Sequence, residues 1–242
     1  MGVLGFGYTW DGHACAEIRT PGGRTVLIDP WFGNPRSPKA ADAVERCVLL
    51  LVTHGHGDHL GDAVALASRL HPAWPCIHEL SLWLARQLPG GGDAVTGMNK
   101  GGTVEAAGLK VTMVHAEHSA GDWNAEGGVP LYLGEPVGFI IELEDGRRVY
   151  HAGDTDVFGD MRLIAELHHP DVALLPIGGH YTMDPRGAAL AAELLGVSVV
   201  VPIHYGTFPA LAGTPEQLRA ALDERGRQAV RVVAPGPGEA VS

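Results

Sequence analysis

Short runs of apolar and β-branched residues recur along the chain, and their length predicts β-strands rather than long helices. The run at 47–53 is apolar almost throughout, which is typical of a buried strand. Gly22-Gly23 and Asp145-Gly146 each separate two runs and predict tight hairpins. The predicted strands cover residues 14–19, 25–29, 47–53, 110–114, 137–143, 148–151, 172–176 and 197–203.

Helical spacing of apolar residues lies between some of these strands. Residues 60–70 are apolar at positions 60, 63, 64, 67 and 70, which predicts one helix. Asp184-Pro185 supplies an N-cap and a first-turn proline for a second helix that ends before Gly196. Thr214 and Gln217 have the spacing of a capping box at the start of a third. This order predicts an α/β protein with two mixed sheets packed together and helices outside.

The segment 119–136 differs from its surroundings. It is rich in Gly, Ala and Glu, carries Trp123, Asn124 and Tyr132, and has no clean period. We predict a long loop, and loops of this length are often functional. A plain surface excursion is the equal alternative.

Length, charge and cysteine content narrow the class of protein. A chain of 242 residues is expected to form one domain over residues 1–242. The formal net charge of −11 repels phosphate backbones and argues against a nucleic-acid partner. The three cysteines lack CxxC spacing, which indicates reduced thiols in a cytoplasmic protein. No signal-peptide pattern and no apolar run near the ~18 residues of a membrane span are present, so no membrane partner is expected.

The stretch THGHGDHLGD, residues 53–62, carries the strongest chemical signal. Three histidines and one aspartate, His54, His56, Asp58 and His59, fall within six residues just after the 47–53 strand. Glycine at positions 55 and 57 is expected to let the backbone turn sharply so that these side chains converge. Imidazole and carboxylate together suit first-row divalent metals. The alternative is a polar turn in which His59 only begins a helix, and four potential ligands in six residues argue against it.

A two-metal site needs further ligands, and three candidates each follow a predicted strand. His118 lies in VHAEHS, Asp154 in HAGDT and His204 in PIHYG. Strands that end at one rim would deliver these side chains to one place. A carboxylate such as Asp154 can bridge two ions.

The cluster at 54–59 resembles the HxHxDH signature of the metallo-β-lactamase superfamily, and the later histidines and the GDT motif follow in the order of that superfamily. The stretches IDPWFGNP, HAGDTDVFGDM, LPIGGHYTMDP and PIHYGTFP are similar to a branch of bacterial and archaeal metal-dependent hydrolases related to ascorbate-phosphate lactonase. The resemblance covers essentially the whole chain. It implies a four-layer αββα sandwich with two mixed sheets flanked by helices.

The same resemblance implies two divalent metal ions per chain. Zinc is the first expectation, and manganese, nickel and iron also suit the donor set. In related proteins the aspartate of this signature binds the second metal, orients the attacking water, or does both. The implied ligands are His54, His56 and His118 for one ion and Asp58, His59 and His204 for the other, with Asp154 bridging.

Four further residues have both a functional and a structural interpretation. His180 is positioned to stabilise a developing oxyanion or to protonate a leaving group, or else is a structural loop residue. His13 either lines the active site or is structural, and His151 either steadies a ligand or is a hydrogen-bonded core histidine. Asp29 either orients a metal-binding histidine or stabilises the turn that follows it, and the turn is slightly favoured.

The best-supported function is metal-dependent hydrolysis of an ester-type bond, with a lactone or phosphoester of a small metabolite as substrate. Two alternatives come from other classes: an iron-dependent redox protein of the same fold, and a non-catalytic metal-binding or regulatory protein. The first would require a flavin domain for which no residues are left, and the second is at odds with the intact ligand set. Relatives often assemble into homo-oligomers, but no exposed apolar stripe marks an interface here.

Overall fold

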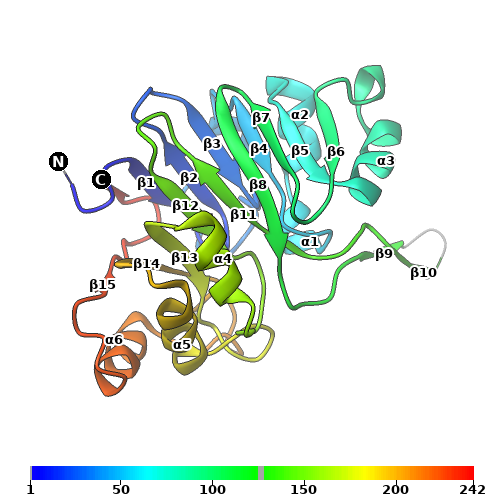
Figure 1. Cartoon of the computed structure of the whole chain (residues 1–242). Helices are drawn as coiled ribbons and strands as arrows, with labels where there is room; N and C mark the ends of the chain where they lie inside the picture. The colour runs from blue at the N-terminus through cyan, green and yellow to red at the C-terminus, as the bar shows by residue number, and fades with distance from the viewer. Residues whose placement is uncertain (1, 125–127) are drawn as a thin grey trace.

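The first sheet contains the first and the last strand of the structure. The computed structural model describes residues 2–124 and 128–242. Five strands follow the order β16-β1-β2-β3-β4, and pairing of β16 with β1 places the two termini side by side (Figure 1). The β2–β3 hairpin at Gly22-Gly23 is confirmed as antiparallel, whereas β3 and β4 are parallel, so this sheet is mixed. Its strands are β1 (Gly7–Trp10), β2 (Ala16–Arg19), β3 (Thr25–Ile28), β4 (Leu49–Leu51) and β16 (Ala240–Val241).

The second sheet has seven strands in the order β15-β14-β13-β12-β11-β8-β7. The β11–β12 hairpin at Asp145-Gly146 is antiparallel, as predicted, and β12, β13 and β14 run parallel. The prediction of two mixed sheets is therefore confirmed. Its strands are β7 (Thr103–Ala106), β8 (Leu109–His115), β11 (Val137–Glu142), β12 (Arg148–His151), β13 (Val172–Pro176), β14 (Val199–Ile203) and β15 (Arg231–Val232).

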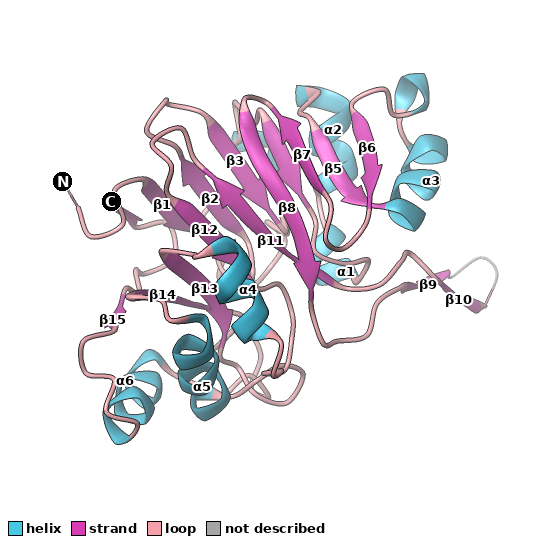
Figure 2. Ribbon diagram, viewed as in Figure 1, coloured by secondary structure: helices cyan, strands magenta, loops and turns pink. Residues whose placement is uncertain are grey.

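Helices flank both sheets (Figure 2). On the side of the first sheet lie α1 (Gly57–Leu60), α2 (Ala63–Leu70) and α3 (His78–Gln87), with the parallel pair β5 (Trp74–Ile77) and β6 (Val95–Met98) beside them. On the side of the second lie α4 (Met161–His168), α5 (Pro185–Leu195) and α6 (Pro215–Glu224). Short 3₁₀ turns occupy Ala41–Ala43 and Pro89–Gly91. The predicted caps of α5 and α6 are confirmed, because Asp184 accepts from the Gly187 N–H and Thr214 and Gln217 form a capping box.

The single helix predicted over 60–70 is wrong at its start. Leu60 ends α1, and α2 begins only at Ala63. Gly61 lies between them with φ of 36°, a left-handed angle that interrupts a helix. A Cβ at this position would lie 2.8 Å from the carbonyl oxygen of Pro30, so the break also lets the chain pass close to the loop after β3.

The predicted long loop over 119–136 contains a hairpin. Strands β9 (Asp122–Asn124) and β10 (Val129–Leu131) pair antiparallel and project from the body of the protein (Figure 1). Residues 125–127 of the predicted loop lie outside the described residues. The alternation of this segment is too short to show as a strand pattern in the sequence.

The register of the second sheet brings several strand ends to one edge. His115 at the end of β8 pairs with Val137, and His151 at the end of β12 pairs with Phe139 and Leu174. The N–H of Val137 also donates to the carbonyl of Thr53, just after β4 in the other sheet. The loops after β4, β8, β12 and β14 therefore meet at the same end of the molecule. Within the described ranges, no helix has the length and apolar character needed to cross a membrane.

Candidate metal centre

All seven predicted ligands lie at the edge where these strands end. His54 and His56 occupy the loop after β4, Asp58 and His59 are in α1, and His204 directly follows β14. His118 lies in the loop after β8, and Asp154 in the loop after β12. The structure thus brings together side chains from four strand ends that are far apart in sequence.

Three histidines form what we call the first donor group: His54, His56 and His118. One ring nitrogen of each lies within 4.8 Å of the others. The His54 Nε2 and His56 Nδ1 atoms are 2.8 Å apart and face each other. This is the set that the resemblance implies for one of the two ions.

A second donor group contains His13, Asp58, His59 and His204, again with ligand atoms within 4.8 Å of one another. Asp58, His59 and His204 are the set implied for the other ion. His13 joins them from the loop before β2, and its Nε2 lies 3.0 Å from Asp58 Oδ2.

Asp154 lies between the two donor groups. Its Oδ2 is 3.6 Å from His118 Nε2 of the first group. The same oxygen is 3.3 Å from His59 Nε2 and 3.0 Å from His204 Nε2 of the second. Asp154 also has a carboxylate oxygen within 4.8 Å of a ring nitrogen of His54 and of His59, close enough for the three to hold one ion. One carboxylate therefore reaches both sets of nitrogens.

The residues fit divalent metals in two respects. Buried polar atoms normally have hydrogen-bond partners, yet among the described residues His59 Nε2 and Asp154 Oδ1 are buried without one. The five histidines and two aspartates are also donors that first-row metals accept. Zinc, manganese, nickel and iron all meet this test.

Burial keeps the histidines of the first donor group neutral. It lowers the pKa of His54 well below its usual value, and it is also the main cause of the lowered pKa of His56 and His118. A neutral imidazole has a free lone pair, which is the form that binds a metal.

Opposite charges dominate around Asp154. Burial alone would raise the pKa of Asp154, but His204 and His59 hold it well below its usual value. Burial alone would lower the pKa of His59, but the carboxylates of Asp154 and Asp29 raise it well above the usual range. The two buried side chains, with Asp154 Oδ2 3.3 Å from His59 Nε2, therefore stabilise each other's charged forms.

Asp29 connects the loop after β3 to the donor groups. Its Oδ2 lies 2.8 Å from His59 Nδ1 and accepts from the Thr53 hydroxyl, and its Oδ1 accepts from the Thr53 N–H. The Asp29 carbonyl also accepts from the Trp31 N–H in the following turn. The side chain therefore orients His59, and the backbone stabilises the turn that sequence reasoning slightly favoured. A carboxylate behind a metal-binding histidine is a common arrangement.

His151 and His180 lie in different surroundings. His151 is buried, and its Nδ1 accepts from the Gly153 N–H in the turn that leads to Asp154. His180 is exposed and packs edge-on against Tyr181, with ring centroids 4.4 Å apart. It belongs to neither donor group. Its loop follows β13 and runs beside the loop of His204, as the N–H of Ile177 donates to the carbonyl of Ile203.

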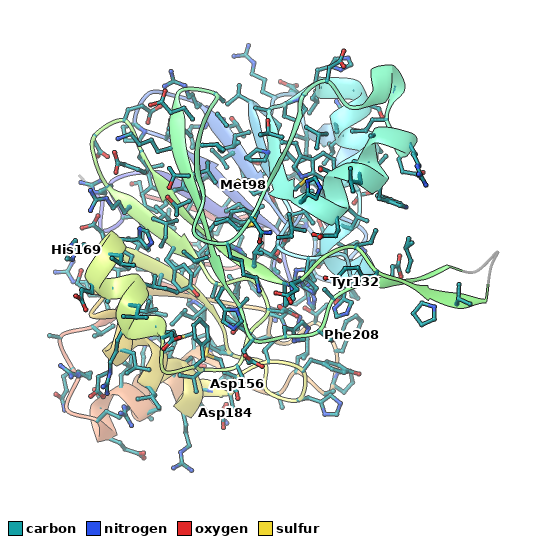
Figure 3. The ribbon with its side chains drawn as sticks, turned by 45° about the vertical axis from the view of Figure 1, so that its right-hand side comes forward. Met98, Tyr132, Asp156, His169, Asp184 and Phe208 are labelled. Atoms are coloured by element: carbon teal, nitrogen blue, oxygen red, sulfur yellow. The ribbon has the colours of Figure 1, made fainter. Side chains whose placement is uncertain are left out.

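Aromatic side chains border the second donor group. The rings of Trp31 and Phe208 lie 5.2 and 5.9 Å from the ring of His13. Phe208 is 39% exposed and Tyr132 is 63% exposed. Figure 3 places Tyr132, at the base of the β9–β10 hairpin, on the same side of the molecule as Phe208. Both residues lie in stretches that carry the family resemblance, IDPWFGNP and PIHYGTFP, although no role was assigned to either from the sequence.

The glycines of the THGHGDH stretch do not act as expected. Neither Gly55 nor Gly57 has a positive φ, so neither supplies the sharp turn that sequence reasoning assigned to them. Gly55 instead leaves room for Leu133, whose Cβ would lie 2.6 Å from a Cβ at position 55. A Cβ at Gly57 would meet nothing within 4 Å.

This difference gives a matched pair of variants. Gly55→Ala is expected to lower the free energy of unfolding by about 1–3 kcal/mol, because the new methyl group displaces buried Leu133. Gly57→Ala is expected to change it by less than about 1 kcal/mol. Denaturant unfolding of both variants measures the contrast, and equal destabilisation would refute the packing role of Gly55.

Comparisons with known proteins agree with this fold. A model of the Beta-lactamase superfamily domain matches residues 24–205. With two mixed sheets, flanking helices and the HxHxDH cluster at one sheet edge, the chain is a member of the metallo-β-lactamase superfamily.

Close relatives identify the family within it. The chain is 50% identical over 233 residues to a UPF0173 metal-dependent hydrolase of Archaeoglobus fulgidus, covering 96% of each chain. It is 47% identical over 224 residues to one of Koribacter versatilis, covering 92% of this chain and 94% of the relative. The structure of Igni18, a metallo hydrolase of Ignicoccus hospitalis, matches with a TM-score of 0.84 and 37% identity over 98% of this chain and 97% of that one. The chain belongs to the UPF0173 metal-dependent hydrolase family.

Proposed function

We propose that the chain hydrolyses an ester-type bond with a dinuclear metal centre, and that its substrate is a lactone or a phosphoester of a small metabolite. The observation that carries the proposal is the position of Asp154. Its Oδ2 lies near His118 of the first donor group and near His59 and His204 of the second. A carboxylate between two sets of ligands is typical of a bridged pair of ions.

Two divalent ions held there would lower the pKa of a bound water and polarise the bond under attack. Zinc is the first expectation. Among the chain's own groups, Asp58 is the candidate to orient the attacking water. Its Oδ2 contacts His13, which leaves Oδ1 for a further partner, and its side chain is 34% exposed. Burial alone would raise the pKa of Asp58, but its contact with His13 and the charge of His59 lower it, so the carboxylate is ionised.

Charge and surroundings support a small substrate. The net charge of −11 opposes binding of long polyanions. Trp31 and Phe208 offer apolar surface beside the donor groups, suited to a compact organic molecule. The choice of lactone or phosphoester rests on the resemblance to the lactonase-related branch.

A panel of lactones, phosphomonoesters and phosphodiesters tests the proposal, with protein reconstituted separately with zinc and with manganese. Hydrolysis of at least one class with kcat/KM of about 10⁴ M⁻¹ s⁻¹ or more is expected, and a chelator should abolish it. Two tightly bound ions without turnover of any ester would contradict a hydrolase and favour a metal-binding protein without catalysis.

His180 enters the proposal as a group that stabilises developing negative charge or protonates the leaving group. His180→Ala is expected to lower kcat by about 100-fold and to leave the metal content unchanged. His71→Ala, at the exposed end of α2, is the control. If kcat on a true substrate is the same in His180→Ala and the wild type, His180 is structural.

A further inference from the structure

Two hydrogen bonds to its backbone carbonyl hold His13 in place. It follows Gly12 and has a φ of 53°, a left-handed angle that costs a non-glycine residue about 1 kcal/mol or more. Its carbonyl accepts from the Trp10 indole N–H and from the His204 N–H, both at 2.8 Å. His13 and His204 are thereby tied together, and their rings lie 4.0 Å apart. Strained residues that the surrounding structure holds in place concentrate at functional sites.

The two ring nitrogens of His13 have different surroundings. Nδ1 lies 3.0 Å from the hydroxyl oxygen of Thr207, and Nε2 lies 3.0 Å from Asp58 Oδ2. The side chain is fully buried, so both nitrogens are shielded from solvent and, among the described residues, have only these partners. A neutral ring in this position would carry a proton on one nitrogen and a lone pair on the other.

Two histidines of the implied ligand set have the same arrangement. His54 has Nδ1 on the Thr53 hydroxyl at 3.0 Å and Nε2 facing the first donor group. His59 has Nδ1 on Asp29 at 2.8 Å and Nε2 facing Asp154. In each, an oxygen holds Nδ1 and Nε2 points into the cluster, which is how metal-binding histidines are usually oriented. His13 repeats this pattern, with Thr207 in the role of Thr53.

We propose that His13 is a metal ligand, an additional nitrogen donor to the ion held by Asp58, His59 and His204, with the Thr207 hydroxyl oxygen accepting a hydrogen bond from Nδ1–H. This assignment rests on the proposed dinuclear centre. The competing arrangement is a hydrogen bond in which His13 Nε2–H donates to Asp58 and binds no metal. The two differ in whether a lone pair or a proton faces the second donor group.

The assignment makes the two metal positions unequal. With Asp154 as bridge, the first position would have four protein ligands, and four-coordinate geometry suits zinc. The second would have five, His13, Asp58, His59, His204 and Asp154, which leaves one place for a further ligand if that ion is six-coordinate. Manganese, iron and nickel accept six ligands more readily than zinc does.

Cobalt(II) titration of the metal-free full chain tests the proposal, because Co²⁺ reports its coordination in the visible spectrum. The wild type is expected to bind two Co²⁺, with intense absorption from the four-coordinate ion and weak absorption from the six-coordinate one. His13→Ala is expected to bind the second Co²⁺ at least about 100-fold more weakly while the intense band is kept. Thr207→Val is expected to weaken the same step by about 10-fold.

His13→Gln separates the two arrangements, since its amide N–H can still donate to Asp58 but offers no imidazole lone pair. The proposal expects His13→Gln to behave like His13→Ala, with the exposed His71→Gln as control. Wild-type affinity and spectrum in His13→Gln, or in both His13→Ala and Thr207→Val, would overturn it. If circular dichroism shows that His13→Ala does not fold, the Co²⁺ affinities of Thr207→Val and His13→Gln still distinguish a metal ligand from a hydrogen-bond donor. A wild type that binds fewer than two Co²⁺ would instead contradict the dinuclear centre, and the assignment with it.

Discussion

Asp154→Ala is expected to remove both metal ions at once. The Asp154 carboxylate lies 3.0 Å from His204, 3.3 Å from His59 and 3.6 Å from His118, so both donor groups lose their shared anionic ligand. Loss of a residue behind a ligand already weakens metal binding by about 10–100-fold, and loss of a bridging ligand is expected to exceed that for each ion. Metal content after gel filtration should fall from about two ions per chain to near zero, with hydrolysis falling in proportion.

Asp156→Ala is the matched control for this variant. Asp156 lies in the same loop and is labelled in Figure 3, but it is exposed and its carboxylate accepts from the Val157 N–H. It should keep both ions. Two tightly bound ions in Asp154→Ala would show that Asp154 is not the bridge.

Asp29→Ala is expected to destabilise the protein and weaken metal binding together. The buried Asp29 carboxylate accepts from the Thr53 N–H and hydroxyl and contacts His59 Nδ1, and all three partners are buried. Removing one partner from a buried charged network costs about 3–5 kcal/mol of unfolding free energy. The freed His59 ring should also lower affinity for the ion of the second donor group by about 10–100-fold. Denaturant unfolding and metal titration measure the two effects.

Asp62→Ala provides the comparison, because Asp62 contacts the same loop through the Phe32 N–H but does not contact a donor group. The free energy of unfolding of Asp62→Ala should fall by about 1 kcal/mol, and the variant should bind both ions with wild-type affinity. An Asp29→Ala protein with wild-type metal affinity would mean that Asp29 supports only the turn after β3.

Strands buried on both faces were the easiest elements to predict. All five residues of β13 are apolar and buried, and its predicted ends at 172 and 176 agree with the structure. The opposite case is α4, which sequence reasoning did not identify. Met161 and Ile164 of α4 are buried, but Leu163 and Leu167 are 50% and 70% exposed, so apolar character alone does not tell which of its residues face the core. The break at Gly61 was also missed, because it depends on close approach of the loop after β3.

The convergence of the candidate ligands could be predicted because each follows a strand and the strand ends share one edge. The position of His13 could not be predicted in this way. It lies in the loop between β1 and β2, β1 was not among the predicted strands, and its partner Thr207 is 194 residues away. The role of Gly55 was also beyond local reasoning, because Leu133 reaches it from the segment just after β10, far away in the sequence.

Elemental analysis of the purified wild-type chain tests the dinuclear centre most directly, with His56→Ala as control because His56 belongs to the first donor group alone. We predict about two divalent ions per chain for the wild type and about one fewer for His56→Ala. A wild-type chain that holds no metal after reconstitution with zinc, manganese, nickel or iron would contradict the centre, and the proposed hydrolysis with it.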